Sequence, residues 1–195
     1  QECKGAGVSA KEAGFSAAQA KAEGFSAAEC KAAGYTVAEL KFACYPLKEV
    51  TAARYSLTQA KEAGFSATEA RAAGFSAAES RAAGYTAVEL KDGGYSAKQC
   101  KDAGVSAKEA GFSAKEAKRA GLTALEAKAA GYSCMEAKEM GCSLKALQAA
   151  SYSLPELKEV GYSCGQAKKA GYSCVEAKAA GFTCKEAKSG FSLQE

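Results

Sequence analysis

A ten-residue motif recurs along the whole chain. It reads Gly-Phe/Tyr-Ser/Thr-Ala-x-Glu-Ala/Leu-Lys-x-Ala; residues 64–73 show it with Arg71 in place of the lysine, and Gly74 begins the next copy. Counted by their Ser/Thr, the copies run from Ser9 to Ser192. A short internal period is typical of solenoids, in which each unit buries its apolar face only against its neighbours. We therefore expect residues 1–195 to form one continuous repeat array in place of ordinary domains.

Each copy carries the start and stop signals of one short α-helix. With the Ser/Thr numbered 0, its hydroxyl and the Glu/Gln at +3 predict a capping box, and the ring at −1 predicts a hydrophobic staple with the residue at +4. Good helix formers follow, and glycine at +8 favours the left-handed conformation that ends helices. The pattern lacks the alternation typical of strands. It predicts an all-α solenoid of about twenty two-turn helices, one helix per ten-residue repeat.

Helices this short must stack on one another, because nucleation of an isolated helix is costly. On a helical wheel, positions +1, +4, +7 and +8 share one stripe, which we expect to face the core. Lys at +5 and Glu at +3 flank that stripe on opposite sides. If successive helices pack side by side, the Lys of one copy faces the Glu of the next. The sequence thus predicts a ladder of ion pairs, each worth about 0–1 kcal/mol, and leaves the number of helices per turn open.

Two copies, at residues 9–15 and 106–112, are three residues short. Both lie in the same phrase, Gly-Val-Ser-Ala-Lys-Glu-Ala-Gly-Phe-Ser-Ala. The loss amounts to nearly one helical turn, so we expect a shortened helix that keeps its apolar face, with a similar bend at both places. The shared phrase favours an internal duplication of residues 7–103 as residues 104–195.

Departures from the motif cluster first in residues 42–55. Phe42 occupies the exposed position +6, and Cys44 and Arg54 replace the glycine at +8. A non-glycine residue in the left-handed region costs roughly 1 kcal/mol, so these junctions are either strained or built differently. Pro46 replaces the cap residue, where its missing N–H is tolerated. We interpret Phe42 and Arg54 as a partner contact, with neutral drift in a tolerant array as the alternative.

A second group of departures lies in residues 125–151. Leu125 and Met135 place apolar side chains at the exposed position +2 of adjacent copies, and Ala146 stands where a capping glutamate is usual. We predict a second partner contact at Leu125, Met135 and Ala146. It is the better candidate, because Leu125 and Met135 share one face of neighbouring helices. Drift is again the alternative, since single exposed apolar side chains are ordinary.

Nine cysteines occur, mostly at the core positions +1 and +4. There they are expected to act as small buried hydrophobes. Equivalent positions on neighbouring helices lie about 8–10 Å apart, which is too far for a disulfide. Cys44, at a junction, and Cys142, at a ring position, are better placed for a bridge. The odd count leaves at least one thiol free or paired with another chain, and leaves the redox compartment open.

The sequence predicts no catalytic, cofactor-binding or metal site. The Ser/Thr residues serve as caps, the chain has no histidine to activate them, and the glutamates recur at one structural position. The cysteines lack zinc-site spacing, and singly spaced glycines do not form a phosphate-binding loop. No apolar run approaches the roughly 18 residues of a membrane span. The net charge of +4 comes from 26 basic and 22 acidic residues that alternate, which disfavours nucleic acid as a partner.

These observations favour a non-enzymatic structural or scaffold protein that links or braces components of a larger assembly. The chain opens at Gln1 and closes at Glu195, both in mid-copy, as expected of a piece of a longer array or of a chain that packs end to end with copies of itself. A first residue other than Met also allows a removed leader. The alternatives are an array that binds a repetitive surface such as ice, mineral or polymer, and then nucleic-acid binding. Enzyme activity ranks last.

Overall fold

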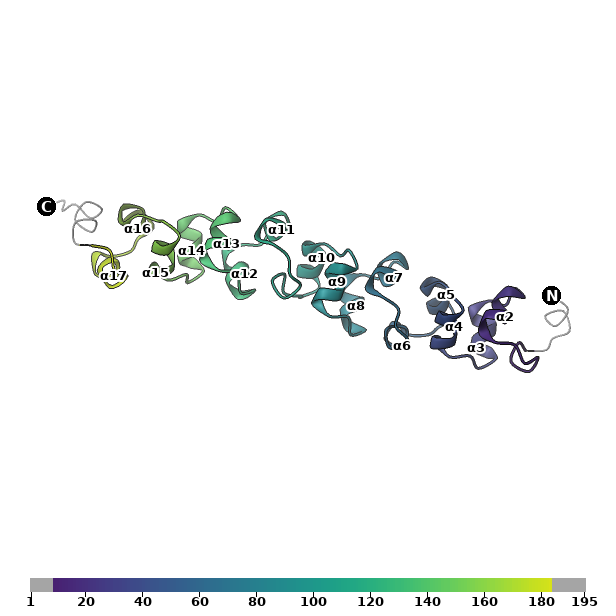
Figure 1. Cartoon of the computed structure of the whole chain (residues 1–195). Coiled ribbons are helices and arrows are strands. Elements are labelled where there is room, and N and C mark those ends of the chain that lie inside the picture. The colour runs from purple at the N-terminus through teal and green to yellow at the C-terminus, as the bar shows by residue number, and fades with distance from the viewer. Residues whose placement is uncertain (1–8, 184–195) are drawn as a thin grey trace. The chain divides into compact units, whose positions relative to one another are not determined.

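The computed structural model describes residues 9–183, and these form short α-helices without any strand (Figure 1). Each helix has six residues except α16, which has seven. The sixteen helices are α2 (Ala17–Ala22), α3 (Ala27–Ala32), α4 (Val37–Phe42), α5 (Leu47–Ala52), α6 (Leu57–Glu62), α7 (Ala67–Ala72), α8 (Ala77–Ala82), α9 (Ala87–Asp92), α10 (Ala97–Asp102), α11 (Ala114–Arg119), α12 (Ala124–Ala129), α13 (Cys134–Glu139), α14 (Leu144–Ala149), α15 (Leu154–Glu159), α16 (Cys164–Ala170) and α17 (Cys174–Ala179). The predicted all-α array with one helix per full repeat is confirmed.

The chain divides into two compact units, Gln1–Val105 and Ser106–Glu195, with α2 to α10 in the first and α11 to α17 in the second. Within each unit the helices follow one another along the chain without gathering around a common centre (Figure 1). The division falls at the second short copy. Internal duplication stays a prediction, and the ends of the array, Gln1 and Glu195 included, lie outside the described residues.

Both short copies form a hydrogen-bonded turn, not the shortened helix that the sequence suggests. In the first copy, Ala13 N–H donates to the Ser9 carbonyl at 3.1 Å. The closing bond from Phe15 N–H to the Ala10 carbonyl, 3.0 Å, follows at once. When three residues are removed from a six-residue helix, only the hydrogen bonds that begin and end the helix can still form. No helical segment remains between them.

The helices begin as predicted. At the start of α7, the Ser66 hydroxyl accepts from the Glu69 N–H at 3.2 Å, and the Glu69 carboxylate accepts from the Ser66 N–H at 2.7 Å. The same capping box starts fourteen of the sixteen described helices. Two helices lack it: α5 begins at Pro46 without a side-chain cap, and in α14 the hydroxyl of Ser143 receives only the N–H of Ala146.

The helices also end as predicted, with a left-handed residue at +8. Gly64 has φ 87°, and the following Phe65 N–H donates to the Ala60 carbonyl at 3.0 Å, the longer bond of a Schellman motif. The three non-glycine residues at +8 adopt the same conformation; they are Cys44 (φ 59°), Arg54 (φ 65°) and Ser151 (φ 63°). Of the two possibilities raised by the sequence, these junctions are therefore strained and not built differently.

Within each unit the helices stack with a period of two copies. The closest packing joins helices two apart, such as α3 with α5 and α12 with α14. The tyrosines follow the same period: the Tyr85 hydroxyl donates to the Phe65 carbonyl at 2.7 Å, and the Tyr132 hydroxyl donates to the Phe112 carbonyl at 2.8 Å. Each bond spans 20 residues. Each unit is thus a solenoid with two helices per turn, a number that the sequence left open.

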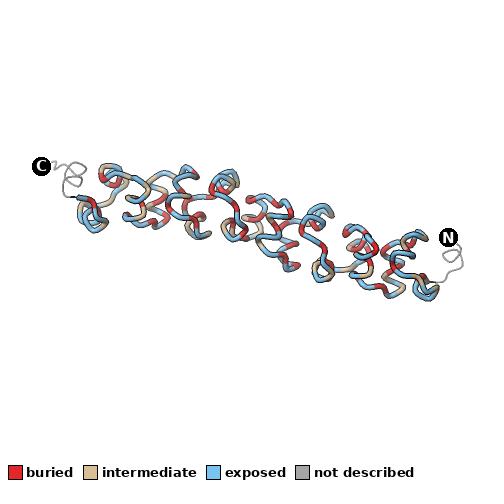
Figure 2. Tube along the Cα trace, in the orientation of Figure 1, coloured by how far each residue is buried: buried red, intermediate tan, exposed pale blue. Residues whose placement is uncertain are grey.

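The core is built from positions +1 and +4, the ring and part of +7. In the copy of α8, Ala77, Ser80 and Ala83 are buried, whereas Gly84 is exposed. Buried positions recur in this way within every repeat (Figure 2). The expectation that +8 belongs to the buried stripe is wrong. The helix has already ended there, and the left-handed residue turns the chain outward.

The lysine at +5 contacts the junction that lies two copies further on. The Lys41 ammonium donates to the Gly64 carbonyl, lies 4.5 Å from the centroid of the Phe65 ring, and lies 3.4 Å from the Glu69 carboxylate. It therefore holds the end of one helix and the start of the next. We call this contact the lysine clip. The residues whose side chains donate to such a carbonyl include Lys11, Lys21, Lys31, Lys41, Lys61, Arg81, Lys138 and Lys158.

The predicted ion-pair ladder exists, but the expected register between adjacent copies is wrong. The paired lysines meet the capping glutamate three copies on. The pairs include Lys41–Glu69, Lys61–Glu89, Lys108–Glu136 and Lys128–Glu156. The two-copy stacking explains the difference. A lysine reaches the end of the helix that stacks on its own helix, and the capping glutamate of the following helix lies beside that end. Such exposed pairs contribute about 0–1 kcal/mol each.

Candidate functional site

The fold uses the polar residues that recur in every copy. The capping boxes, the lysine clips and the tyrosine bonds engage the Ser/Thr, Glu, Lys and Tyr of the motif with one another or with backbone carbonyls. Positions +2 and +6 differ, because their side chains point to solvent and vary from copy to copy. A partner can therefore contact the array through the side chains at these two positions.

Large apolar side chains are exposed at five of the described +2 and +6 positions. Their exposed fractions are 87% for Phe42, 51% for Val88, 64% for Leu125, 58% for Met135 and 77% for Val175. The sequence singled out Phe42, Leu125 and Met135. It missed Val88 and Val175, although both occupy position +2, the same position as Leu125 and Met135, which is the signal that could have found them.

The first predicted contact lies on α4 and at the end of α5. Phe42 stands alone there, because position +6 holds Ala22 on α2 and Glu62 on α6, the helices that stack on α4. Arg54 is tied to the array, since its carbonyl accepts from Lys31 Nζ at 2.7 Å. Within residues 9–183, no hydrogen bond or ring contact joins the side chains of Phe42 and Arg54. Their shared role in binding a partner stays a prediction.

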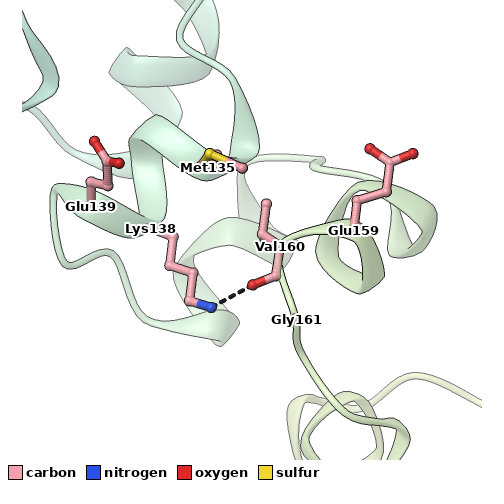
Figure 3. A pocket seen from close by; sticks show the side chains of 6 residues that line it. All are labelled: Met135, Lys138, Glu139, Glu159, Val160 and Gly161. Atoms are coloured by element: carbon pink, nitrogen blue, oxygen red, sulfur yellow. Dashed lines mark hydrogen bonds between the residues drawn. The ribbon is translucent and has the colours of Figure 1, made fainter.

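The second predicted contact is divided between two places. Met135 on α13 lies beside Val160, which follows α15, because helices two copies apart stack on each other (Figure 3). Leu125 belongs to α12 and is not part of that group. Ala146 is half-buried at the start of α14. The geometry thus groups Met135 with a residue that the sequence did not single out, and the partner role of all three predicted residues stays a prediction.

A pocket of about 510 Å³ lies between α13 and the end of α15 (Figure 3). It is lined by Met135, Lys138, Glu139, Glu159, Val160 and Gly161. The side chains of Met135 and Val160 face the space, and the carboxylates of Glu139 and Glu159 stand on either side of it. Lys138 Nζ donates to the Val160 carbonyl at 2.5 Å and lies 4.7 Å from the centroid of the Tyr162 ring, so it forms a lysine clip.

The residue at +7 lies where a helix approaches the helix stacked on it. At Gly93, an added Cβ would lie 2.7 Å from the Cβ of Ala67, so position +7 packs directly on the helix two copies back. Alanine usually occupies +7, and Ala83 there is buried. Val160 carries a branched side chain at this position and is only half-buried.

The two glutamates of the pocket differ from the capping glutamates. The hydrogen bond from Lys108 lowers the pKa of Glu136, a capping residue of α13. Glu139 and Glu159 occupy +6, are exposed, and form no hydrogen bond or ion pair within the part of the chain that the structure describes. The Lys138 ammonium is already bound to a carbonyl. The pocket therefore offers an apolar floor and two carboxylates free to accept from a cation.

The ten-residue period agrees with a known repeat family. The family described as Decapeptide repeat region matches residues 7–77, 64–134 and 131–195. The chain belongs to this family. No curated protein and no solved structure gives a significant match. The family thus accounts for the repeat itself and not for the residues in which the copies differ.

No disulfide joins the cysteines that the structure describes, namely Cys30, Cys44, Cys100, Cys134, Cys142, Cys164 and Cys174. Most of them are buried, and burial raises the pKa of the Cys100 thiol. Cys44 is exposed and Cys142 is half-buried; a bridge involving either of them stays a prediction. Cys3 and Cys184 lie outside the described residues.

Two general features of the decapeptide array bear on its chemistry. Within residues 9–183, no helix is both long enough and apolar enough to cross a bilayer. The same residues contain no group of three or more His, Cys, Asp or Glu side chains arranged to hold a metal ion.

Proposed function

We propose that this decapeptide repeat protein is a non-enzymatic scaffold that links or braces components of a larger assembly. The observation that supports the proposal most is that the polar groups of the repeat bond to one another or to backbone carbonyls of the array. Capping glutamates bind the Ser/Thr caps, lysines bind carbonyls two copies on, and tyrosine hydroxyls bind the carbonyls of earlier rings. The repeated chemistry therefore maintains the array, and specificity is left to exposed side chains that differ among the copies.

The same contacts favour a stiff spacer. Each clipped helix is tied to the copies that lie two and three further on, as the contacts of Lys41 with Gly64 and Glu69 illustrate. Bonds of this kind recur along each unit, so bending one junction requires several contacts to break together. A stiff unit with distinct exposed side chains can hold partners at fixed separations, which is the property that a brace needs.

The main alternative is an array that binds a repetitive surface. The side chains at the exposed positions support this alternative less well. Such an array should present one constant face, yet position +2 holds Thr68 on α7, Val88 on α9 and Lys98 on α10. Nucleic-acid binding comes next. It is disfavoured because the recurring lysines are engaged with carbonyls and glutamates, as Lys61 is with Gly84 and Glu89.

Affinity purification of the tagged full-length chain from its native source, after mild cross-linking, tests the scaffold proposal. We expect a reproducible set of proteins cross-linked to exposed residues at +2 and +6, identified by mass spectrometry. A variant with Phe42→Ser, Leu125→Ser and Met135→Ser should lose part of the set, whereas the matched variant Thr58→Ser, at an ordinary +2 position, should retain it.

Three results would contradict the proposal: a chain that purifies alone, adsorption to ice or mineral that the triple variant retains, or a gel shift with nucleic acid at physiological salt. Sedimentation over a range of concentrations tests the end-to-end version separately. Filament growth with concentration is expected, and a monomer at every concentration would exclude it.

A further inference from the structure

We infer that the pocket between α13 and α15 is the docking site for a partner segment that carries a large apolar side chain next to a lysine or arginine. The inference rests on the proposed scaffold function and names the chemistry of one partner. It follows from three properties of the pocket: its apolar floor, the apolar row that continues from it, and the charge at its rim.

The floor consists of side chains suited to receive an apolar group. Met135 is 58% exposed, and a methionine side chain is flexible and polarizable, so it adapts to different partners. Val160 is half-buried and faces the same space (Figure 3). The space between these side chains belongs to the pocket of about 510 Å³.

An apolar row extends the floor along the stacked helices. Position +2 is Met135 on α13, Pro155 on α15 and Val175 on α17, and all three side chains are exposed. The helices that carry them are linked by the tyrosine bonds, with the Tyr152 hydroxyl 2.9 Å from the Tyr132 carbonyl. Scattered exposed apolar residues are ordinary, but several along one face indicate an interaction surface.

The intervening helices provide an internal comparison. Position +2 holds Leu125 on α12, Lys145 on α14 and Gly165 on α16, so no apolar row forms there. The exposed Leu125 therefore lacks the continuation that Met135 has. This difference is the reason for assigning the docking site to the α13 side of the stack.

The rim determines the charge of the partner. The chain has a net charge of +4, yet two carboxylates without hydrogen-bond partners within the described residues, those of Glu139 and Glu159, stand on opposite sides of the floor. The ammonium of Lys138 points to the Val160 carbonyl and not to either carboxylate. A lysine or arginine next to the partner's apolar side chain would therefore lie near a carboxylate, whichever side of the pocket the partner chain leaves by.

Fluorescence anisotropy with the full-length chain tests the inference. The probe is a short end-blocked peptide of alternating leucine and arginine, labelled with fluorescein. We expect saturable binding that weakens about tenfold or more in Met135→Ser and in the double variant Glu139→Gln/Glu159→Gln, because each removes one of the two kinds of contact. Two altered peptides are also tested, one with glutamate in place of arginine and one with serine in place of leucine. Each should bind the unaltered chain at least as weakly as the leucine–arginine peptide binds these variants.

The matched controls are Leu125→Ser, at +2 of α12, and Glu62→Gln, at +6 of α6. Both remove an exposed side chain of the same kind at the same repeat position, and neither should change the affinity. Circular dichroism confirms that all variants keep their helices, which is expected because every substituted side chain is exposed.

Failure of the probe to bind, or equal losses in the control variants, would overturn the docking site. Self-association that Met135→Ser abolishes would do so as well, by assigning the pocket to a second copy of the chain. If affinity purification still yields cross-linked partners in any of these cases, the scaffold proposal stands and only the assignment of this pocket falls.

Discussion

The junctions that precede α7 and α8 are consecutive in the chain and differ in one contact. Each has a left-handed glycine, a phenylalanine ring and a capping box. In each, the carbonyl of the ring residue accepts from a tyrosine two copies on: Phe65 from Tyr85 at 2.7 Å, and Phe75 from Tyr95 at 2.8 Å. Only the first junction has a lysine clip, which Lys41 supplies.

The second junction lacks the clip because Thr51 stands at +5 of α5. The Thr51 hydroxyl donates to the Leu47 carbonyl at 3.0 Å in its own helix, and a threonine is too short to reach the next stacked helix. Phe65 beneath its lysine is only 3% exposed, whereas Phe75 is partly open to solvent. The comparison teaches that caps and tyrosine bonds suffice to build a junction, and that the lysine covers the ring.

Raising the pH should have the largest effect, because it removes the tyrosine contact that both junctions share. Burial raises the pKa of Tyr85 from 10.0 to about 12, and burial raises the pKa of Tyr152 likewise to about 12. Since the folded-state pKa is the higher one, the contribution to stability is complete below pH 10 and is lost as the pH rises towards 12. We expect loss of helical circular dichroism alongside tyrosinate absorbance. Helices that persist after full ionisation would contradict this account.

Removing the clip should make the first junction resemble the second. Lys41→Met keeps most of the side-chain stem but leaves the Gly64 carbonyl without its charged donor and Phe65 without its cation. We expect the free energy of unfolding in urea to fall by about 1 kcal/mol. The control is Lys48→Met, at the exposed position +2 of α5, which should have little effect. Equal losses in both variants would mean that the clip contributes no stability.

Adding a lysine clip to the second junction should make it resemble the first. Thr51→Lys places an ammonium within reach of the Gly74 carbonyl and the Phe75 ring, and should raise the free energy of unfolding by about 0.5–1 kcal/mol. Lysine also has a higher helix propensity than threonine. The matched variant Thr58→Lys, at position +2 of α6, measures that gain alone. If the two variants gain equally, the added stability comes from propensity and not from a clip.

The smallest effect concerns the capping glutamates. Burial acts to raise the pKa of Glu69, but hydrogen bonds from Ser66 and the charge of Lys41 outweigh it, so the pKa lies below 4.5. The stabilisation is therefore present above that value and is lost as the pH falls through the folded-state pKa. In Lys41→Met, NMR titration of the carboxyl carbons should show a higher pKa for Glu69. The pKa of Glu79, which is lowered by its bonds with Ser76, should not change.

The local parts of the fold could be predicted because their signals lie within one copy. The capping box of Ser66 and Glu69 spans three residues, and the left-handed turn at Gly64 needs only a glycine after a helix. The candidate site was predicted in part. Met135 stood out as an apolar residue at an exposed position, but nothing within its own copy indicated that Val160 would lie beside it.

The sequence by itself determined the helices, their starts, their ends and the strict period, because hydrogen bonds between residues three to five apart specify each of them. Only the tertiary structure decided which copies meet. The stacking of each helix on the second one along directs the lysines to carbonyls 22 or 23 residues away and the tyrosines to carbonyls 20 residues away. It also brings Met135 and Val160 to the same pocket. Nearly identical copies offer no local signal to distinguish the next neighbour from the second, so the packing of the whole stack makes that choice.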